Sequence, residues 1–209
     1  FEKNNKTDFA ILHYTAALKV NPEYKMALEN RGNLFVRLNS FDNALIDFNQ
    51  LIKLDSSYYY YYFMRGSCFY KIRKFQNAIF DFNKSIRINP TDFGSYVNKG
   101  SSFDALKQPD SALTCYKKAI ELNPNTPDTY YNIGAINYYK ANYLEAINYF
   151  NKTLELKSDF GDALSNRGNC YYFIGNYQKA FEDFTLFLSK NPYNANILNM
   201  FYFLKKLFD

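Results

Sequence analysis

The sequence is poor in histidine, the side chain that most often serves as a general base or a metal ligand in enzymes. Among 209 residues there is one histidine, His13, and there is no tryptophan. A single histidine without a cluster of cysteines or carboxylates does not make a metal site. It also leaves a serine or cysteine nucleophile with no other base. The glycines lie too far apart to form a phosphate-binding loop. We therefore expect no catalytic residue, no metal site, no cofactor and no enzymatic activity in this chain.

Cysteine, long apolar runs and clustered positive charge are also scarce. The three cysteines, Cys68, Cys115 and Cys170, favour small buried positions in a reducing compartment over a disulfide framework. No apolar stretch approaches the roughly 18 residues that a membrane span needs. The net charge is +5 without any block of five basic residues, which argues against nucleic-acid binding. We expect an intracellular, cytoplasmic protein. A targeting segment upstream of Phe1 is left open, because the chain does not begin with methionine.

What the sequence does contain is one pattern with a period of 34 residues. A glycine, an alanine 12 residues later and an aromatic residue four residues after that recur five times. The glycines are Gly32, Gly66, Gly100, Gly134 and Gly168, and the aromatic residues are Phe48, Phe82, Tyr116, Phe150 and Phe184. Such a period predicts an all-α fold, an α-solenoid in which each unit is a pair of helices stacked on its neighbours. We expect each aromatic ring to pack into the space that its glycine leaves.

The period also divides the chain. Residues 1–22 match the second helix of a unit, and counting back places Phe1 inside a first helix, so we expect the chain to begin within a repeat. Five complete units follow, and residues 193–209 form a last helix. We expect prolines to end the second helix in four units. The five units are 25–58, 59–92, 93–126, 127–160 and 161–192, and the prolines are Pro22, Pro90, Pro124 and Pro192.

A second pattern couples the two helices of a unit. Arginine precedes the glycine only in those units where aspartate stands three residues after the alanine. In the fourth complete unit both positions are apolar, Ile133 and Tyr149. This correlation predicts structural ion pairs between helices, namely Arg31 with Asp47, Arg65 with Asp81 and Arg167 with Asp183.

The residues Tyr130–Gly134, Tyr143–Ile147 and Phe150 together resemble the tetratricopeptide repeat, and the resemblance covers nearly the whole chain. It implies a right-handed superhelix whose first helices line a concave groove and whose second helices line the convex face. Some members hold acidic chaperone tails with a clamp that needs a lysine three residues before the glycine. Glu29 and Ser165 occupy that position beside Asn33 and Asn169, so we expect no chaperone-tail binding.

The resemblance also implies that the position two residues before the glycine faces the groove. Four asparagines stand there, and side-chain amides could bind the donors and acceptors of an extended peptide backbone. They are Asn30, Asn98, Asn132 and Asn166. A general abundance of asparagine in this chain is the competing explanation.

The asparagine series is interrupted at Met64, which together with Tyr60 and Phe63 predicts an apolar patch with aromatic hydroxyls in the groove, extended by Tyr131. The competing explanation is an apolar surface without a partner.

The last helix is apolar around most of its circumference, with residues such as Phe201 and Phe208. Either it caps the array, or further chain or a second copy covers it, which would make a homo-oligomer. Taken together, we predict a non-catalytic protein–protein interaction scaffold that binds an extended peptide or partner protein in its groove. The alternatives are a substrate-recruiting segment of a larger enzyme and a self-assembling structural solenoid.

Overall fold

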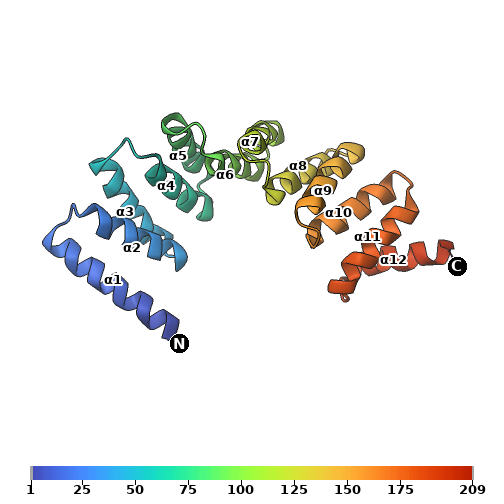
Figure 1. Cartoon of the computed structure of the whole chain (residues 1–209), viewed down its shortest axis with the longest axis horizontal. Helices are drawn as coiled ribbons and strands as arrows, with labels where there is room; N and C mark the ends of the chain where they lie inside the picture. Colours follow the sequence, from blue (N-terminus) through green and yellow to red (C-terminus); the bar gives the residue numbers. More distant parts are fainter. Residues whose placement is uncertain (1, 209) are drawn as a thin grey trace. The chain divides into compact units, whose positions relative to one another are not determined.

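The computed structural model describes residues 2–208, with side chains from Thr7 onward, and every regular element in that part of the chain is an α-helix (Figure 1). The helices are α1 (Glu2–Val20), α2 (Lys25–Arg37), α3 (Phe41–Leu54), α4 (Tyr59–Lys71), α5 (Phe75–Ile88), α6 (Phe93–Ala105), α7 (Pro109–Leu122), α8 (Pro127–Tyr139), α9 (Tyr143–Leu156), α10 (Gly161–Phe173), α11 (Tyr177–Lys190) and α12 (Ala195–Phe208).

Contacts divide the chain into two compact units, Phe1–Cys115 and Tyr116–Asp209. In the first unit each helix from α1 to α6 packs against the next, and α4 also contacts α6. In the second unit α8 to α12 pack in the same sequential way, and α8 also contacts α10. Each unit is therefore built from neighbouring helix pairs, as an α-solenoid requires.

The glycine of the repeat lies against the aromatic ring of the same repeat, which confirms the predicted packing at four positions. A Cβ atom built on Gly168 would lie 2.6 Å from the ring of Phe184, and one on Gly134 would lie 2.7 Å from the ring of Phe150. The corresponding distances at Gly32 and Gly66 are 3.2 and 2.9 Å. No side chain fits at 2.6–2.9 Å without displacing the ring, so the closeness of the two helices explains the glycine despite its cost of about 1 kcal/mol inside a helix.

The loop between the two helices of a repeat has one recurring geometry. In the first of these loops the N–H of Asn39 donates to the carbonyl of Val36, and the N–H of Ser40 donates to the carbonyl of Phe35. These two bonds form a Schellman motif, which requires a left-handed residue after the helix. The residues with positive φ in these loops are 34 positions apart, namely Asn39, Arg73, Lys107, Ala141 and Gly175. Only one of the five is glycine, so the left-handed position of the turn has no characteristic residue type by which the sequence could reveal it.

The second helices end where the sequence predicted. The helices α1, α5, α7 and α11 each end two residues before one of the four prolines. Phe1 lies outside the described residues. Because α1 is continuous from Glu2, the break between two helices that the period would place near Asn5 is absent.

All three cysteines are buried, as predicted, and Cys68 and Cys170 have no exposed surface. Burial raises the pKa of both of these thiols to about 12. Across residues 2–208, none of the helices has the length and apolar character that crossing a membrane would require.

Candidate functional site

The predicted binding residues lie on the first helices of the repeats, and in each compact unit we call the surface that carries them the first-helix face. In the first unit it carries Asn30 on α2, Tyr60, Phe63 and Met64 on α4, and Asn98 on α6. In the second unit it carries Tyr131 and Asn132 on α8 and Asn166 on α10. All eight side chains are half-buried, so each has surface left for a ligand.

In the first unit the structure brings Tyr60 and Phe63 together, with ring centroids 6.2 Å apart and the ring planes 27° from parallel. The Phe63 ring also lies 3.4 Å from the position of a Cβ on Gly94, at the start of the next first helix. Met64 packs against the buried core between α2, α3 and α4. The patch is thus tied to the packing between repeats, and its exposed part is a rigid apolar surface.

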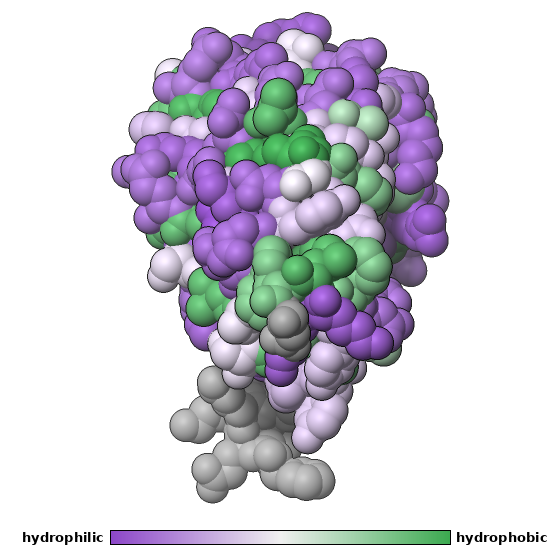
Figure 2. All heavy atoms as spheres, turned by 90° about the vertical axis from the view of Figure 1, so that its right-hand side faces the viewer, coloured by the Kyte–Doolittle hydropathy of each residue, from purple (hydrophilic) through white to green (hydrophobic). Residues whose placement is uncertain are grey.

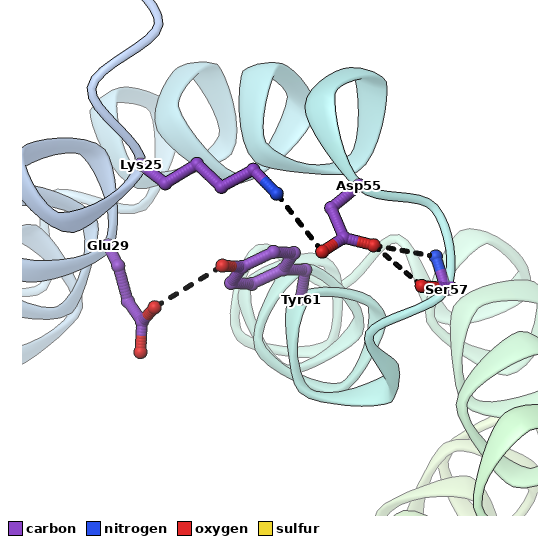
Figure 3. Close-up of polar contacts among 5 residues, drawn as sticks. All are labelled: Lys25, Glu29, Asp55, Ser57 and Tyr61. Atoms are coloured by element: carbon purple, nitrogen blue, oxygen red, sulfur yellow. Dashed lines mark hydrogen bonds and ion pairs between the residues drawn. The ribbon is translucent and has the colours of Figure 1, made fainter.

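A polar network borders this patch at the beginning of α2 and α4 (Figure 3). The Tyr61 hydroxyl donates to Glu29 at 3.3 Å, and Lys25 pairs with Asp55 at 3.1 Å. Asp55 also accepts bonds from the backbone N–H and the hydroxyl of Ser57. Burial and the charge of Glu29 raise the pKa of Tyr61 to about 12. These contacts fix the loop between α3 and α4 against α2, and so fix the start of the helix that carries the patch.

Two asparagines of the predicted series already bind the preceding first helix. The Asn98 amide donates to the Ser67 hydroxyl at 3.4 Å, and the Asn166 amide donates to the Tyr131 hydroxyl at 3.2 Å. The Tyr131 ring in turn stacks on Phe160 with centroids 5.0 Å apart. Since an amide carries two N–H donors and one oxygen, each asparagine keeps further groups for a ligand while its orientation is held by the protein.

Two further asparagines, Asn33 and Asn169, were not among the predicted binding residues. They follow Gly32 and Gly168 directly, and the side-chain Oδ1 atom of each is buried without a hydrogen-bond partner. Burial raises the pKa of Tyr60, and a hydrogen bond from the Asn33 amide opposes this shift, which leaves the Asn33 oxygen as the unpaired atom. A buried acceptor without a donor costs about 1–3 kcal/mol. Their shared position in the repeat was visible in the sequence, but their missing partners were not.

The Arg–Asp residues predicted to couple helices lie together in the structure. Arg65 donates through Nε and Nη2 to the two carboxylate oxygens of Asp81, both at 2.7 Å. The remaining nitrogen, Nη1, donates to Asn49 on the preceding second helix at 2.8 Å. Each arginine therefore joins three helices. The other two sets, with Nη2–carboxylate distances of 2.6 Å, are Arg31 with Asp47 and Thr15, and Arg167 with Asp183 and Asn151.

The aspartates of these pairs are inaccessible to solvent or nearly so. Burial raises the pKa of Asp47 and Asp81, and the paired arginines oppose that shift. Within the described side chains there is no group of histidine, cysteine and carboxylate residues that could hold a metal ion. The charged residues at the centre of this fold are thus engaged in holding helices together.

The last helix, α12, is partly covered by α11. The Phe201 and Phe181 rings stack with centroids 4.8 Å apart, and Leu204 is fully buried. Four large apolar residues of α12 remain exposed, with 48–56% of their surface accessible, namely Tyr202, Phe203, Leu207 and Phe208. Figure 2 views the molecule from the side on which α12 lies and shows hydrophobic surface interspersed among hydrophilic residues.

Paired helices and glycine–aromatic packing at a fixed period define a helical-repeat protein of the α-solenoid class. Models described as tetratricopeptide repeat match residues 1–59, 59–92 and 137–195, and a TPR repeat model matches residues 105–140. The chain belongs to the tetratricopeptide repeat family. Members are typically non-catalytic modules for protein interaction, and the chain has the fold of such a scaffold.

Several solved structures share this fold. YrrB, described as a TPR protein with an unusual peptide-binding site, is 25% identical, and the match covers 89% of this chain and 96% of YrrB with a TM-score of 0.73. MamA is 26% identical over 75% of this chain and 92% of MamA, with a TM-score of 0.71. PilW, a type IV pilus biogenesis factor, is 19% identical over 95% of this chain and 92% of PilW, with a TM-score of 0.80. No curated protein sequence matches the chain significantly.

Proposed function

We propose that this chain is a non-catalytic scaffold that binds an extended protein segment along the first-helix face of each unit. The observation that carries the proposal is the pair of buried, unpaired amide oxygens of Asn33 and Asn169. Each oxygen lacks a donor and is shielded from solvent, so its side chain must turn toward the surface before the N–H of an extended backbone can reach it. A donor from the segment would remove a desolvation cost of about 1–3 kcal/mol at each position, and the cost of turning the side chain counts against this gain.

The other residues of the first-helix face would then select and align the segment. The half-buried patch of Tyr60, Phe63 and Met64 is rigid and amphipathic, which suits an apolar side chain of the partner. The amides of Asn98 and Asn166 are already oriented by bonds to the protein, so little conformational entropy is lost when they bind a backbone. The peptide-binding site named in the description of YrrB supports this mode by analogy.

The test begins with selection of binders from a displayed library of random 12-residue peptides. Affinities of recovered peptides are then measured by fluorescence anisotropy for the wild type and for the variant in which Asn98, Asn132 and Asn166 are all alanine. A peptide on the second unit loses its bonds to Asn132 and Asn166, and two hydrogen bonds at about 0.5–1.5 kcal/mol each predict an affinity loss of roughly fivefold or more.

The matched control replaces Asn77 and Asn148, two exposed asparagines on second helices, by alanine. We expect the control to bind like the wild type, and circular dichroism verifies that each variant is folded. Equal affinity of the triple variant and the wild type would contradict the role of the asparagines. Recovery of no peptide whose binding depends on the first-helix face would contradict the proposal as a whole.

We also propose self-association through α12 as a second function, because four large apolar side chains are exposed on this helix. Sedimentation velocity over a range of concentrations tests it. We expect a concentration-dependent rise in sedimentation coefficient that Phe203→Ser and Leu207→Ser abolish, whereas a monomer at all concentrations would contradict it.

A further inference from the structure

One outward-facing position of the second helices changes character along the chain. It lies two residues after the repeat alanine, and it is exposed in all six second helices. The first three helices carry Leu12, Ile46 and Phe80 there, with exposed fractions of 63%, 63% and 56%. The later three carry Thr114, Asn148 and Glu182. Because the fold exposes this position in every repeat and accepts polar residues there, packing does not account for the three apolar side chains.

A basic position accompanies the apolar one. Seven residues later, two helical turns along the same side, α1, α3 and α5 carry exposed Lys19, Lys53 and Arg87. The later second helices carry Glu121, Glu155 and Ser189 at the same place. The Lys84 ammonium group also lies 5.5 Å from the centre of the Phe80 ring, which adds positive charge beside the apolar residues.

The arginine bridges hold these three helices next to one another at the level of the apolar residues. Arg31 donates to Thr15 on α1 and to Asp47 on α3, the latter directly after Ile46. Arg65 donates to Asn49 on α3 and to Asp81 on α5, the latter directly after Phe80. The buried bridges thus fix the apolar residues of α1, α3 and α5 in one row.

A cavity of about 590 Å³ opens between α1 and α3 within this surface. Its lining includes Ile46 from the apolar row, Lys19 and Lys53 from the basic row, and Leu18 and Leu28 from the core. It also reaches the buried Arg31–Asp47 pair. The cavity is large enough to admit a side chain, and it combines apolar walls with two ammonium groups.

We propose that the second-helix face, defined by Leu12, Ile46, Phe80, Lys19, Lys53 and Arg87, docks a second protein segment in which carboxylates flank apolar side chains. The apolar row would bury the partner's apolar residues, and the basic row would pair with its carboxylates, which also speeds association. This surface lies on other helices than the first-helix face, so the proposal does not depend on the one made there.

The same face carries features that favour a protein over an anionic membrane. Asp8 and Asp42 stand four residues before Leu12 and Ile46, on the same side of α1 and α3, and both are exposed. Acidic lipid headgroups would cover the whole face and would be repelled by these two carboxylates, whereas a protein segment can place its own carboxylates against the basic row alone, three turns further along each helix. A cavity between helices receives a protruding side chain better than it receives a bilayer surface.

The test uses a displayed library of random 16-residue peptides selected on the wild-type chain. Counter-selection uses the variant with Leu12→Thr, Ile46→Asn and Phe80→Glu, which places at each position the residue of a later repeat. We expect peptides rich in both apolar and acidic residues that lose at least about tenfold in affinity for this variant. We expect a similar loss for Lys53→Glu with Arg87→Glu, and weaker binding to the wild type at higher salt.

The matched control is Asn148→Ala with Glu182→Ala at the equivalent positions of α9 and α11, and it should bind like the wild type. All substituted side chains are exposed, and unchanged thermal melts establish that the variants are folded. Recovery only of peptides that both variants bind as well as the wild type does, or of peptides without acidic residues, would overturn the proposal. Vesicles of phosphatidylcholine with about one-third phosphatidylserine provide a second test. If the wild type binds them more strongly than the variant with Leu12→Thr, Ile46→Asn and Phe80→Glu does, the face is assigned to a membrane and the proposal is overturned.

Discussion

Replacement of Asn169 by leucine separates binding from stability. Leucine is close to asparagine in size but has no polar atom, so it removes the buried oxygen that lacks a partner in the unbound protein. We expect the free energy of unfolding to rise by about 1–3 kcal/mol, because the desolvation cost of that oxygen disappears. Urea denaturation measures the change, and for a chain of this size each kcal/mol corresponds to about 2–4 °C in Tm.

The same substitution should weaken peptide binding about tenfold, since the acceptor for the segment is lost. Asn137 provides the control, because it is buried but donates to the Ile133 carbonyl and accepts from the Asn142 amide. Asn137→Leu should lower stability by about 1–2 kcal/mol and leave peptide affinity unchanged. If Asn169→Leu destabilises the protein as much as Asn137→Leu does and binds peptide normally, the oxygen has no role in binding.

Three further predictions concern the repeat itself. Arg65→Ile alone should lower the free energy of unfolding by about 3–5 kcal/mol, because it leaves Asp81 buried and unpaired. Adding Asp81→Tyr copies the pair Ile133 and Tyr149 of another repeat and should recover part of that loss. Urea denaturation measures both changes, and additive costs of the two substitutions would exclude coupling. Ala141→Gly should stabilise the protein by about 1 kcal/mol and Gly175→Ala should destabilise it by a similar amount, because both residues have positive φ, which strains any residue with a Cβ. No atom lies within 4 Å of a Cβ on Gly175, so a steric clash does not add to the effect. Thermal melts in which neither variant changes Tm would contradict the presence of backbone strain at these turns. The pKa of Tyr61 is raised to about 12, so the stability that its neutral hydroxyl contributes is fully present below pH 10 and is lost as the pH rises through about 12. An ultraviolet titration of the phenolates tests this, because Tyr61→Phe should remove an ionisation step at the high end of the curve. If the substitution removes a step near pH 10, the prediction is contradicted.

The repeat could be predicted from the sequence because its packing uses fixed residue types at fixed spacings. Gly134 and Phe150 must have those types for the two helices to approach, and an arginine and an aspartate that occur only together indicate a pair. The turn at Ala141 could not be predicted in this way. Its left-handed conformation is imposed by the two helices that it joins, so different residues occupy it in each repeat.

The candidate site was predictable only in outline. The sequence indicated which positions lie on the first helices, but whether a polar atom has a partner depends on the neighbouring side chains. Asn98 and Asn166 turn out to bind neighbouring repeats, while Asn33 and Asn169 have oxygens that nothing in the described chain satisfies. Phe63 was expected in an apolar patch of the groove, and the sequence did not indicate that its ring also lies beside Gly94 in the next repeat.

A crystal structure of the chain with a selected peptide tests most directly whether an extended segment binds along the first-helix face. We predict an extended backbone with an N–H group at roughly 3 Å from the Oδ1 atom of Asn33 or Asn169. A peptide whose binding depends on Asn98, Asn132 or Asn166 but that lies elsewhere, or a peptide on this face that leaves both oxygens without a donor, would contradict the proposal.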